Sequence, residues 1–264
     1  MSNRDINIHI KRKKLRHRKK IINLITFSLI SILSITIGFK KILSFKIGLS
    51  NITFKNRFIP TSSKNVPLDS ADVFTICIDA GHGDWDFGTI GLNDSAEKDI
   101  VLSITLKLGE LLESQDIDVV YTRTTDTLFW SDNSTENLYE RVNISKDSGA
   151  DLFISIHCNS SDESHSYKGI ETWYNNDNDE SNLFATLIQN ELSNLEYTSD
   201  RGTKYYSEDE PLAVLNNNDV PSVLIELGFL SNLSDESFLT SENGQSLSAE
   251  AIFNGILTYK DTLN

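Results

Sequence analysis

The chain has 264 residues, of which 24 are basic and 38 acidic, so its formal net charge at pH 7 is -14. Residues 1–70 hold 15 lysines and arginines and only two acidic residues, whereas the remainder holds 9 basic and 36 acidic residues, a charge of -27 (9 minus 36). A surface this acidic repels phosphate backbones and anionic polymers, which excludes nucleic acid as a partner of the remainder.

The amino terminus has the pattern of a membrane signal-anchor. The basic run KRKKLRHRKK (11–20) leads directly into 19 uncharged, mainly apolar residues (21–39). That length just spans a hydrocarbon core as a helix, and basic residues beside a span mark its cytoplasmic side. A cleaved signal peptide has a shorter apolar region followed by small residues, whereas this span ends with Phe39 and is followed by Lys40 and Lys41. We therefore predict a basic cytoplasmic tail (1–20) and an uncleaved transmembrane signal-anchor (21–39).

The rest of the chain divides into a connecting segment and one domain. Residues 40–71 contain two of the four prolines and no sustained hydrophobic period, which predicts an extracytoplasmic stalk. Residues 72–264 are numerous enough for one globular domain with a substantial core. With only Cys77 and Cys158, no disulfide framework holds this domain together, and we interpret both cysteines as small buried apolar residues.

Within the domain, apolar strand-like runs alternate with amphipathic helical segments. The predicted strands are 73–79, 117–122, 151–157, 169–174 and 222–227. The predicted helices are 97–114, 135–147, 180–195 and 247–259, with a short strand or turn near 212–215. This alternation predicts an α/β fold with a mostly parallel, twisted central sheet flanked by helices.

Two of the domain's three histidines follow predicted strands. His82 lies among glycines in ICIDAGHGDWDFG, and His157 ends DLFISIH. The carboxyl ends of strands in open α/β sheets are the usual place for ligands. One histidine after a strand is more often structural, and a tight turn would explain the glycines, but two equivalent placements favour a site. The third, His165, lies in a polar loop and is interpreted as a surface residue, with contact to the substrate as the alternative.

Two carboxylates also stand in apolar surroundings. Glu97 lies on the apolar face of the helix 97–114, where burial requires a cationic partner. The alternative for Glu97 is a capping box with Asp94 as the N-cap. Glu226 lies near the end of the apolar run VPSVLIELGFL, where burial raises the pKa of a carboxyl and suits it to proton transfer. The alternative for Glu226 is a side chain turned out at the edge of the sheet.

His82, Glu97 and His157 together supply the donors of a catalytic zinc site with an open position for water. Zinc there would activate the water and polarise a carbonyl, while Glu226 would take the proton and pass it to the leaving amine. The set predicts metal-assisted amide hydrolysis, without the HExxH helix of many metalloproteases. Cys158 points to the opposite face of its strand from His157 and does not join the site.

Six stretches of the domain form a specific combination: ICIDAGHGDWDFGTIG, EKDIVLSITLKLGELL, VVYTRTTD, ERVNISKDSGADLFISIHCNSS, GIETWY and VPSVLIELGFLSN. In this order they resemble the zinc-dependent N-acetylmuramoyl-L-alanine amidases of bacterial cell walls. The resemblance implies zinc on the two histidines and Glu97, with Glu226 as the catalytic carboxylate. It implies hydrolysis of the amide between N-acetylmuramic acid and L-alanine of the stem peptide. Asp84 and Phe87 stand where the family usually has glycine and proline.

The resemblance also implies peptidoglycan as the partner. The signal-anchor would hold the domain on the outer side of the cell membrane, at the cell wall. Two other functions stay open at this point. One is a zinc peptidase that cuts within the stem peptide, and the other is a non-catalytic wall-binding or regulatory protein with this fold. Small anchored amidases of this pattern include those resembling sporulation and germination enzymes. The sequence indicates neither the substrate-binding residues nor an activating protein.

Overall fold

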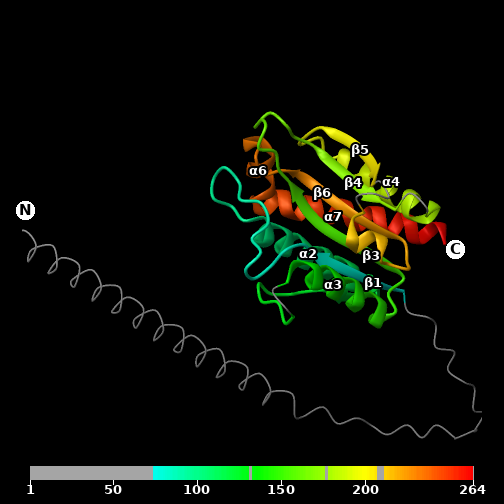
Figure 1. Cartoon of the computed structure of the whole chain (residues 1–264). Coiled ribbons are helices and arrows are strands. Elements are labelled where there is room, and N and C mark those ends of the chain that lie inside the picture. The colour runs from blue at the N-terminus through cyan, green and yellow to red at the C-terminus, as the bar shows by residue number, and fades with distance from the viewer. Residues whose placement is uncertain (1–73, 131–132, 176–177, 207–210, 264) are drawn as a thin grey trace, which may run out of the picture. The chain divides into compact units, whose positions relative to one another are not determined.

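A computed structural model describes residues 74–130, 133–175, 178–206 and 211–263. They form an α/β domain around a six-stranded sheet (Figure 1). The strands are β1 (Thr75–Ala80), β2 (Asp118–Tyr121), β3 (Leu152–Asn159), β4 (Ile170–Tyr174), β5 (Asp200–Tyr205) and β6 (Ser222–Phe229). The helices are α2 (Glu97–Glu113), α3 (Ser134–Ser148), α4 (Asp179–Ser193), α5 (Ala213–Asn216), α6 (Leu233–Leu239) and α7 (Glu242–Thr262).

The predicted tail, signal-anchor and stalk lie outside the described residues. Across the residues that are described, no helix is both long enough and apolar enough to cross a membrane.

The strands are ordered β2-β1-β3-β6-β4-β5. All neighbouring pairs are parallel except β4 and β6, which are antiparallel. The predicted mostly parallel sheet is therefore confirmed, with one antiparallel pair. Because β1, β3 and β6 run in the same direction, their carboxyl ends meet at one edge of the sheet, where α/β folds place ligands.

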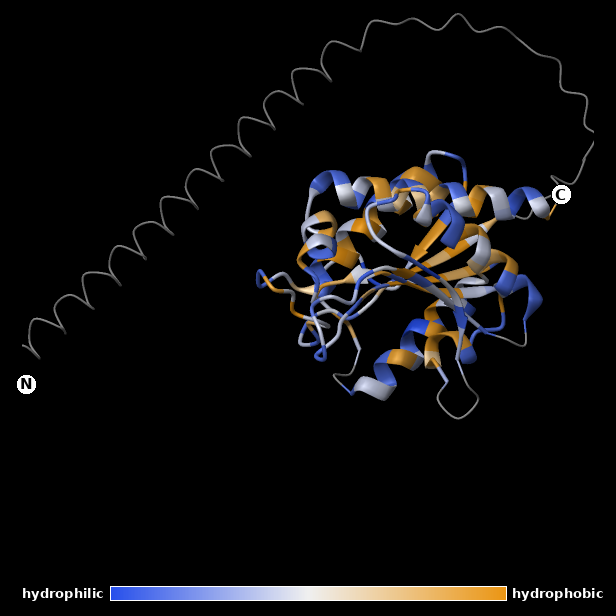
Figure 2. Ribbon diagram, turned by 90° about the horizontal axis from the view of Figure 1, so that it is seen from above, coloured by the Kyte–Doolittle hydropathy of each residue, from blue (hydrophilic) through white to orange (hydrophobic). Residues whose placement is uncertain are grey.

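Helices cover both faces of the sheet, which forms the mainly apolar middle layer in Figure 2. Ile78, Ile154 and Ile225 belong to the apolar core shared with α2, α4 and α7 on one face. Phe153 and Leu224 belong to the core shared with α3 and α5 on the other. Since the middle strands are buried on both faces, their sequences are almost continuously apolar, which is why the prediction located them.

Three elements differ from the prediction. No strand is predicted over Asp200–Tyr205, because DRGTKY contains no apolar run; it forms β5, an edge strand that pairs only with β4. No helix is predicted over the short polar segment Leu233–Leu239, which forms α6. Near 212–215 the strand alternative is wrong, because Ala213–Asn216 is a single helical turn, α5.

The two cysteines are buried and free, as predicted. Cys77 belongs to the apolar cluster on the α3 face of the sheet, and Cys158 belongs to the cluster on the α2 face. Both therefore act as small core residues.

Candidate active site

The loop after β1 carries the first histidine toward the second. His82 adopts a left-handed φ of 60°, and Gly83 follows with a φ of 128°. A Cβ added to Gly81 would lie 2.3 Å from the His157 ring. The glycines therefore let the backbone turn and approach a histidine where any side chain would clash.

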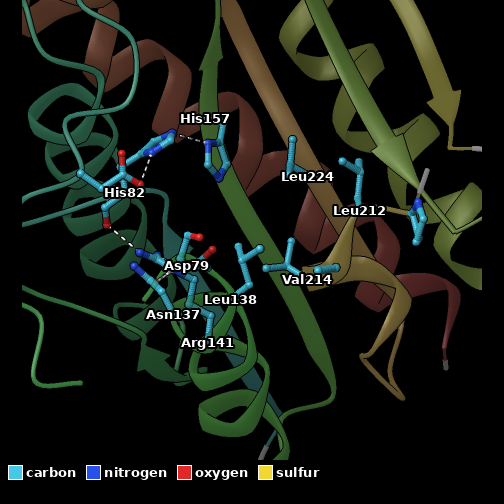
Figure 3. A pocket seen from close by; sticks show the side chains of 13 residues that line it. Asp79, His82, Asn137, Leu138, Arg141, His157, Leu212, Val214 and Leu224 are labelled. Carbon is cyan, nitrogen blue, oxygen red and sulfur yellow. Dashed lines mark hydrogen bonds and ion pairs between the residues drawn. The ribbon is translucent and has the colours of Figure 1, made fainter. Parts of the chain in front are cut away.

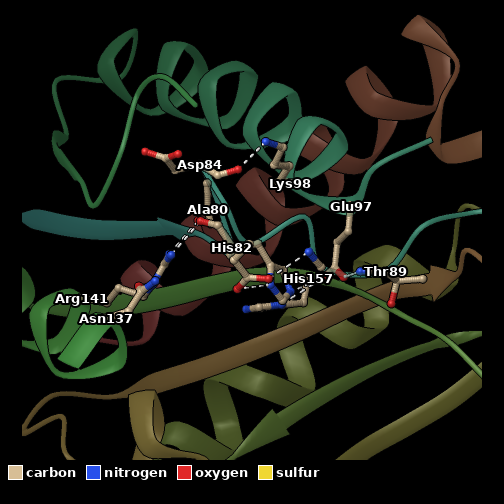
Figure 4. A network of polar contacts seen from close by, with 12 residues as sticks. Ala80, His82, Asp84, Thr89, Glu97, Lys98, Asn137, Arg141 and His157 are labelled. Carbon is tan, nitrogen blue, oxygen red and sulfur yellow. Dashed lines mark hydrogen bonds and ion pairs between the residues drawn. The ribbon is translucent and has the colours of Figure 1, made fainter. Parts of the chain in front are cut away.

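Three donors from separate elements converge at this edge of the sheet (Figure 4): His82 from the loop, Glu97 from the first turn of α2 and His157 from β3. Nε2 of His82 lies 3.2 Å from Nδ1 of His157. Each of these nitrogens lies 3.1 Å from Oε1 of Glu97. Ligands bound at about 2.0–2.1 Å to a tetrahedral zinc ion are themselves roughly 3.3 Å apart, so the three atoms fit this ion closely.

Neighbouring groups fix the orientation of the donors. Oδ2 of Asp86 lies 2.8 Å from Nδ1 of His82, which leaves Nε2 directed at the other two donors. Oε2 of Glu97 accepts a hydrogen bond from the backbone N–H of Thr89 at 2.8 Å, and Oε1 accepts one from the N–H of Cys158 at 2.9 Å. Such outer partners are a regular feature of metal ligands, because they set ring orientation and tautomer.

The electrostatics of the cluster favour positive charge. Burial opposes ionisation of Glu97, but hydrogen bonds with His157 and His82 outweigh it and hold the pKa of Glu97 well below its usual range. Burial likewise opposes protonation of His82, but the carboxylates of Glu97 and Asp86 outweigh it and raise the pKa of His82. The site therefore attracts cations, whether protons or a metal ion.

The start of α2 decides between the two roles considered for Glu97. The N-cap residue is Ala96, which makes no side-chain cap. Asp94 lies outside the helix with a left-handed φ of 61°. The capping-box alternative is therefore wrong, and the side chain of Glu97, only 2% exposed as a residue, turns to the histidines instead.

Two buried arginines hold the backbone of the histidine loop, and the sequence did not indicate them. Arg141 of α3 donates from Nη2 to the carbonyl of His82 at 2.7 Å and from Nη1 to Oδ1 of Asp79 at 2.6 Å. Arg123 donates from Nη2 to the carbonyl of Gly81 at 2.8 Å. These bonds stabilise the left-handed turn that presents His82 to the site.

A signal for Arg141 exists on the inner face of its helix. The buried residues of α3 are Asn137, Arg141, Val142 and Ser145. Three of these four are polar, unlike the apolar stripe of an ordinary core helix. A polar inner face requires buried partners, and Asp79, fully buried at the end of β1, is one of them.

Glu226 lies directly beside His157, because the two residues are paired in register across β3 and β6. Residues opposite each other on neighbouring strands share a face of the sheet. The side chain is half-buried, and its Oε2 is buried without a hydrogen-bond partner among the described residues. Burial raises the pKa of Glu226 well above its usual range, and the carboxylates of Glu97 and Glu171 raise it further. Since β6 lies inside the sheet, the sheet-edge alternative is wrong.

The other polar residues noted in the sequence lie outside the donor cluster. His165 is exposed, as predicted, and its Nδ1 lies 2.9 Å from the carbonyl oxygen of Ser231. The exposed Asp84 accepts a hydrogen bond at its backbone carbonyl from Nζ of Lys98 at 2.7 Å. The same ammonium lies 4.0 Å from the ring centroid of Phe87. Asp84 and Phe87 therefore shape the loop, whereas Asp86 is the carboxylate that contacts a histidine.

A groove of about 370 Å³ opens beside the two histidines, between α3 and α5 (Figure 3). Its apolar wall is formed by Leu138, Leu212, Val214 and Leu224. Asp86, His82 and His157 line it as well. A molecule held there would have one end at the metal donors.

The sequence of the chain is similar to those of known proteins. The chain matches the family of N-acetylmuramoyl-L-alanine amidases over residues 76–258, more than half of its length. It is 39% identical over 189 residues to the uncharacterized protein YqiI of Bacillus subtilis (strain 168), covering 71% of this chain and 85% of YqiI. It is 32% identical over 232 residues to the germination-specific N-acetylmuramoyl-L-alanine amidase of the same organism, covering 83% of this chain and 94% of that enzyme.

The fold has close counterparts among solved structures. The CwlD amidase from Clostridioides difficile, solved in complex with the GerS lipoprotein, superposes with a TM-score of 0.65 at 36% identity. The match covers 72% of this chain and 99% of CwlD.

Proposed function

The chain belongs to the family of N-acetylmuramoyl-L-alanine amidases, enzymes that hydrolyse peptidoglycan, and we propose that it does so with zinc held by His82, Glu97 and His157. The observation that supports this most strongly is the convergence of the three donor atoms at 3.1–3.2 Å from one another. Zinc bound by such a set activates a water molecule and polarises the amide carbonyl.

Glu226 has the position and the proton affinity for the acid-base role. Its register beside His157 places a carboxylate next to the donors, and its Oε2 has no partner within the described residues. It accepts a proton from the attacking water and delivers it to the departing amine of L-alanine. The raised pKa of Glu226 makes it the stronger base for the first transfer.

The family match also bears on the two other functions that the sequence left open. A stem-peptide peptidase would cleave a different bond, and a non-catalytic wall protein would need none of the four site residues. Relatives over most of this chain are named as amidases, and the site residues are all present in one cluster with Glu226 beside it. Amide hydrolysis at the muramoyl end is tested directly by the appearance of new L-alanine amino termini in a peptidoglycan digest.

We further propose that residues 21–39 anchor the enzyme in the cell membrane, with the catalytic domain outside. The apolar run and its basic flank support this proposal. Only some 30 residues separate this run from the domain, which would keep the domain close to the membrane-proximal wall.

Fractionation of cells that produce the chain tests the anchor. The full chain is expected in the membrane fraction, resistant to high salt and released by detergent. A variant without residues 21–39 is expected in the soluble fraction, and external protease is expected to remove the domain from intact spheroplasts of the full-length strain. Recovery of the full chain as a soluble protein would contradict the proposal.

A further inference from the structure

Two basic side chains lie beside the catalytic carboxylate, on the strand that the sequence did not indicate. Arg201 and Lys204 of β5 both form ion pairs with Oε2 of Glu171 on β4, the arginine through Nε at 2.6 Å. The other oxygen of Glu171 accepts hydrogen bonds from Nδ2 of Asn159 at 3.1 Å and Nε1 of Trp173 at 3.2 Å. Glu171 is only 2% exposed, and both of its oxygens are satisfied inside the protein.

Two cations lie beside the buried carboxylate of Glu171. Burial opposes ionisation of Glu171, but hydrogen bonds and charge interactions with Arg201 and Lys204 outweigh it and lower the pKa of Glu171. The charge of Lys204 also opposes the raised pKa of Glu226 on the neighbouring strand β6. The two cations form a basic spot in a domain that is otherwise strongly acidic.

Both cations are available to a ligand from solvent. Each side chain is 31% exposed. The terminal nitrogens of Arg201 make no further hydrogen bond to any described residue, and they form the planar fork that binds a carboxylate through two parallel bonds. Aromatic rings restrict both cations, with Phe229 5.0 Å from the guanidinium and Trp173 5.4 Å from the ammonium.

The register of the sheet gives the distance between Glu171 and His157, one of the three metal donors. Glu171 pairs with Glu226 across β4 and β6, and Glu226 pairs with His157 across β6 and β3. Two strand spacings of about 4.8 Å place Glu171 roughly 10 Å from His157 on the same face. An extended peptide covers about 3.3–3.6 Å per residue, so this separation corresponds to roughly three residues.

We propose that Arg201 and Lys204 form a subsite for a free carboxylate on the second or third residue of the stem peptide. The inference rests on the proposed function, because it takes the cleaved amide to lie between the metal donors and Glu226. Glu171 is then a positioning residue, which holds the two cations at the edge of the substrate path.

Three synthetic muropeptides with the same glycan and stem test this subsite in the full chain. One has free carboxylates at stem residues two and three, and each of the others has a carboxamide at one of these positions. Loss of a charge-assisted hydrogen bond weakens binding by about tenfold. The carboxamide at the stem position that occupies the subsite is therefore expected to lower kcat/KM by tenfold or more, mainly through a higher KM. Lys204→Met and Arg201→Gln are expected to reduce the preference for the carboxylate muropeptide over the carboxamide, because they lower kcat/KM only for the carboxylate muropeptide. Lys107→Met, which removes a cation from α2 on the opposite face of the sheet, is expected to keep it.

The substrate ratio separates recognition from damage to the fold. A variant that folds poorly would lose activity on all three muropeptides equally, and such an equal loss would count against the subsite. The wild-type comparison needs no substitution at all. If the wild-type chain cuts all three at the same rate, the subsite is wrong and the amidase function stands; if it cuts none of them, both proposals fail.

Discussion

Replacing Glu226 with glutamine is expected to lower the turnover of peptidoglycan by about 10² to 10⁴-fold, the usual contribution of a general acid-base group. Glutamine keeps the size of the side chain, but its amide does not accept a proton from the attacking water. Because Glu226 lies beside the three donors and is not one of them, the variant is expected to bind one zinc ion like the wild type. Turnover and zinc content, measured on the same preparation, separate the two roles.

Glu242→Gln serves as the matched control for this substitution. Glu242 is a carboxylate whose side chain is 81% exposed and which pairs with Lys107 on the α2 side of the molecule. Its change to glutamine is expected to leave both turnover and zinc content unchanged. Full turnover by the zinc-loaded Glu226→Gln variant would show that another group moves the proton.

Removal of zinc is expected to abolish hydrolysis and to destabilise the domain. A ligand present at a thousand times its Kd stabilises the native state by about 4 kcal/mol. For a domain of this size, that corresponds to a fall in Tm on the order of 10 °C when a chelator removes the metal. Adding zinc back is expected to restore both the Tm and the activity.

Two variants test the metal dependence at two levels, the loss of a donor and the loss of a donor's hydrogen-bond partner. His157→Ala removes a donor and is expected to abolish the zinc-dependent rise in Tm. Asp86→Asn keeps all three donors but weakens the partner of His82, so zinc affinity is expected to fall by about 10 to 100-fold. Equal Tm values for wild-type protein with and without zinc, together with activity in the chelator, would contradict a zinc centre.

The elements that sequence predicts best here are those whose environment is simple. β1, β3 and β6 lie inside the sheet with helices on both faces, so their residues form apolar runs. β5 lies at the edge of the sheet. Its sequence DRGTKY has no buried residue, and it forms ion pairs with β4. The start of α7 is capped by Ser241, six residues before the predicted start at 247, because its first turn is polar and lacks the apolar period.

The same reasoning explains which residues of the candidate site the sequence indicates. His82, Glu97, His157 and Glu226 are polar residues in apolar or glycine-rich surroundings, and this contrast is visible in the sequence. The supporting residues stand in polar stretches, and only the polar inner face of α3 points to one of them, Arg141. Their roles depend on distances between elements that only the fold fixes, such as the 2.7 Å from Arg141 of α3 to the carbonyl of His82.

Mass spectrometry of muropeptides released from peptidoglycan by the purified full chain tests the central claim most directly. We predict free stem peptides that begin with L-alanine, together with glycan strands whose muramic acid keeps its lactyl group without a peptide. Both products should require zinc and Glu226. Fragments in which L-alanine stays on the muramic acid, with the cut inside the stem peptide, would contradict the account.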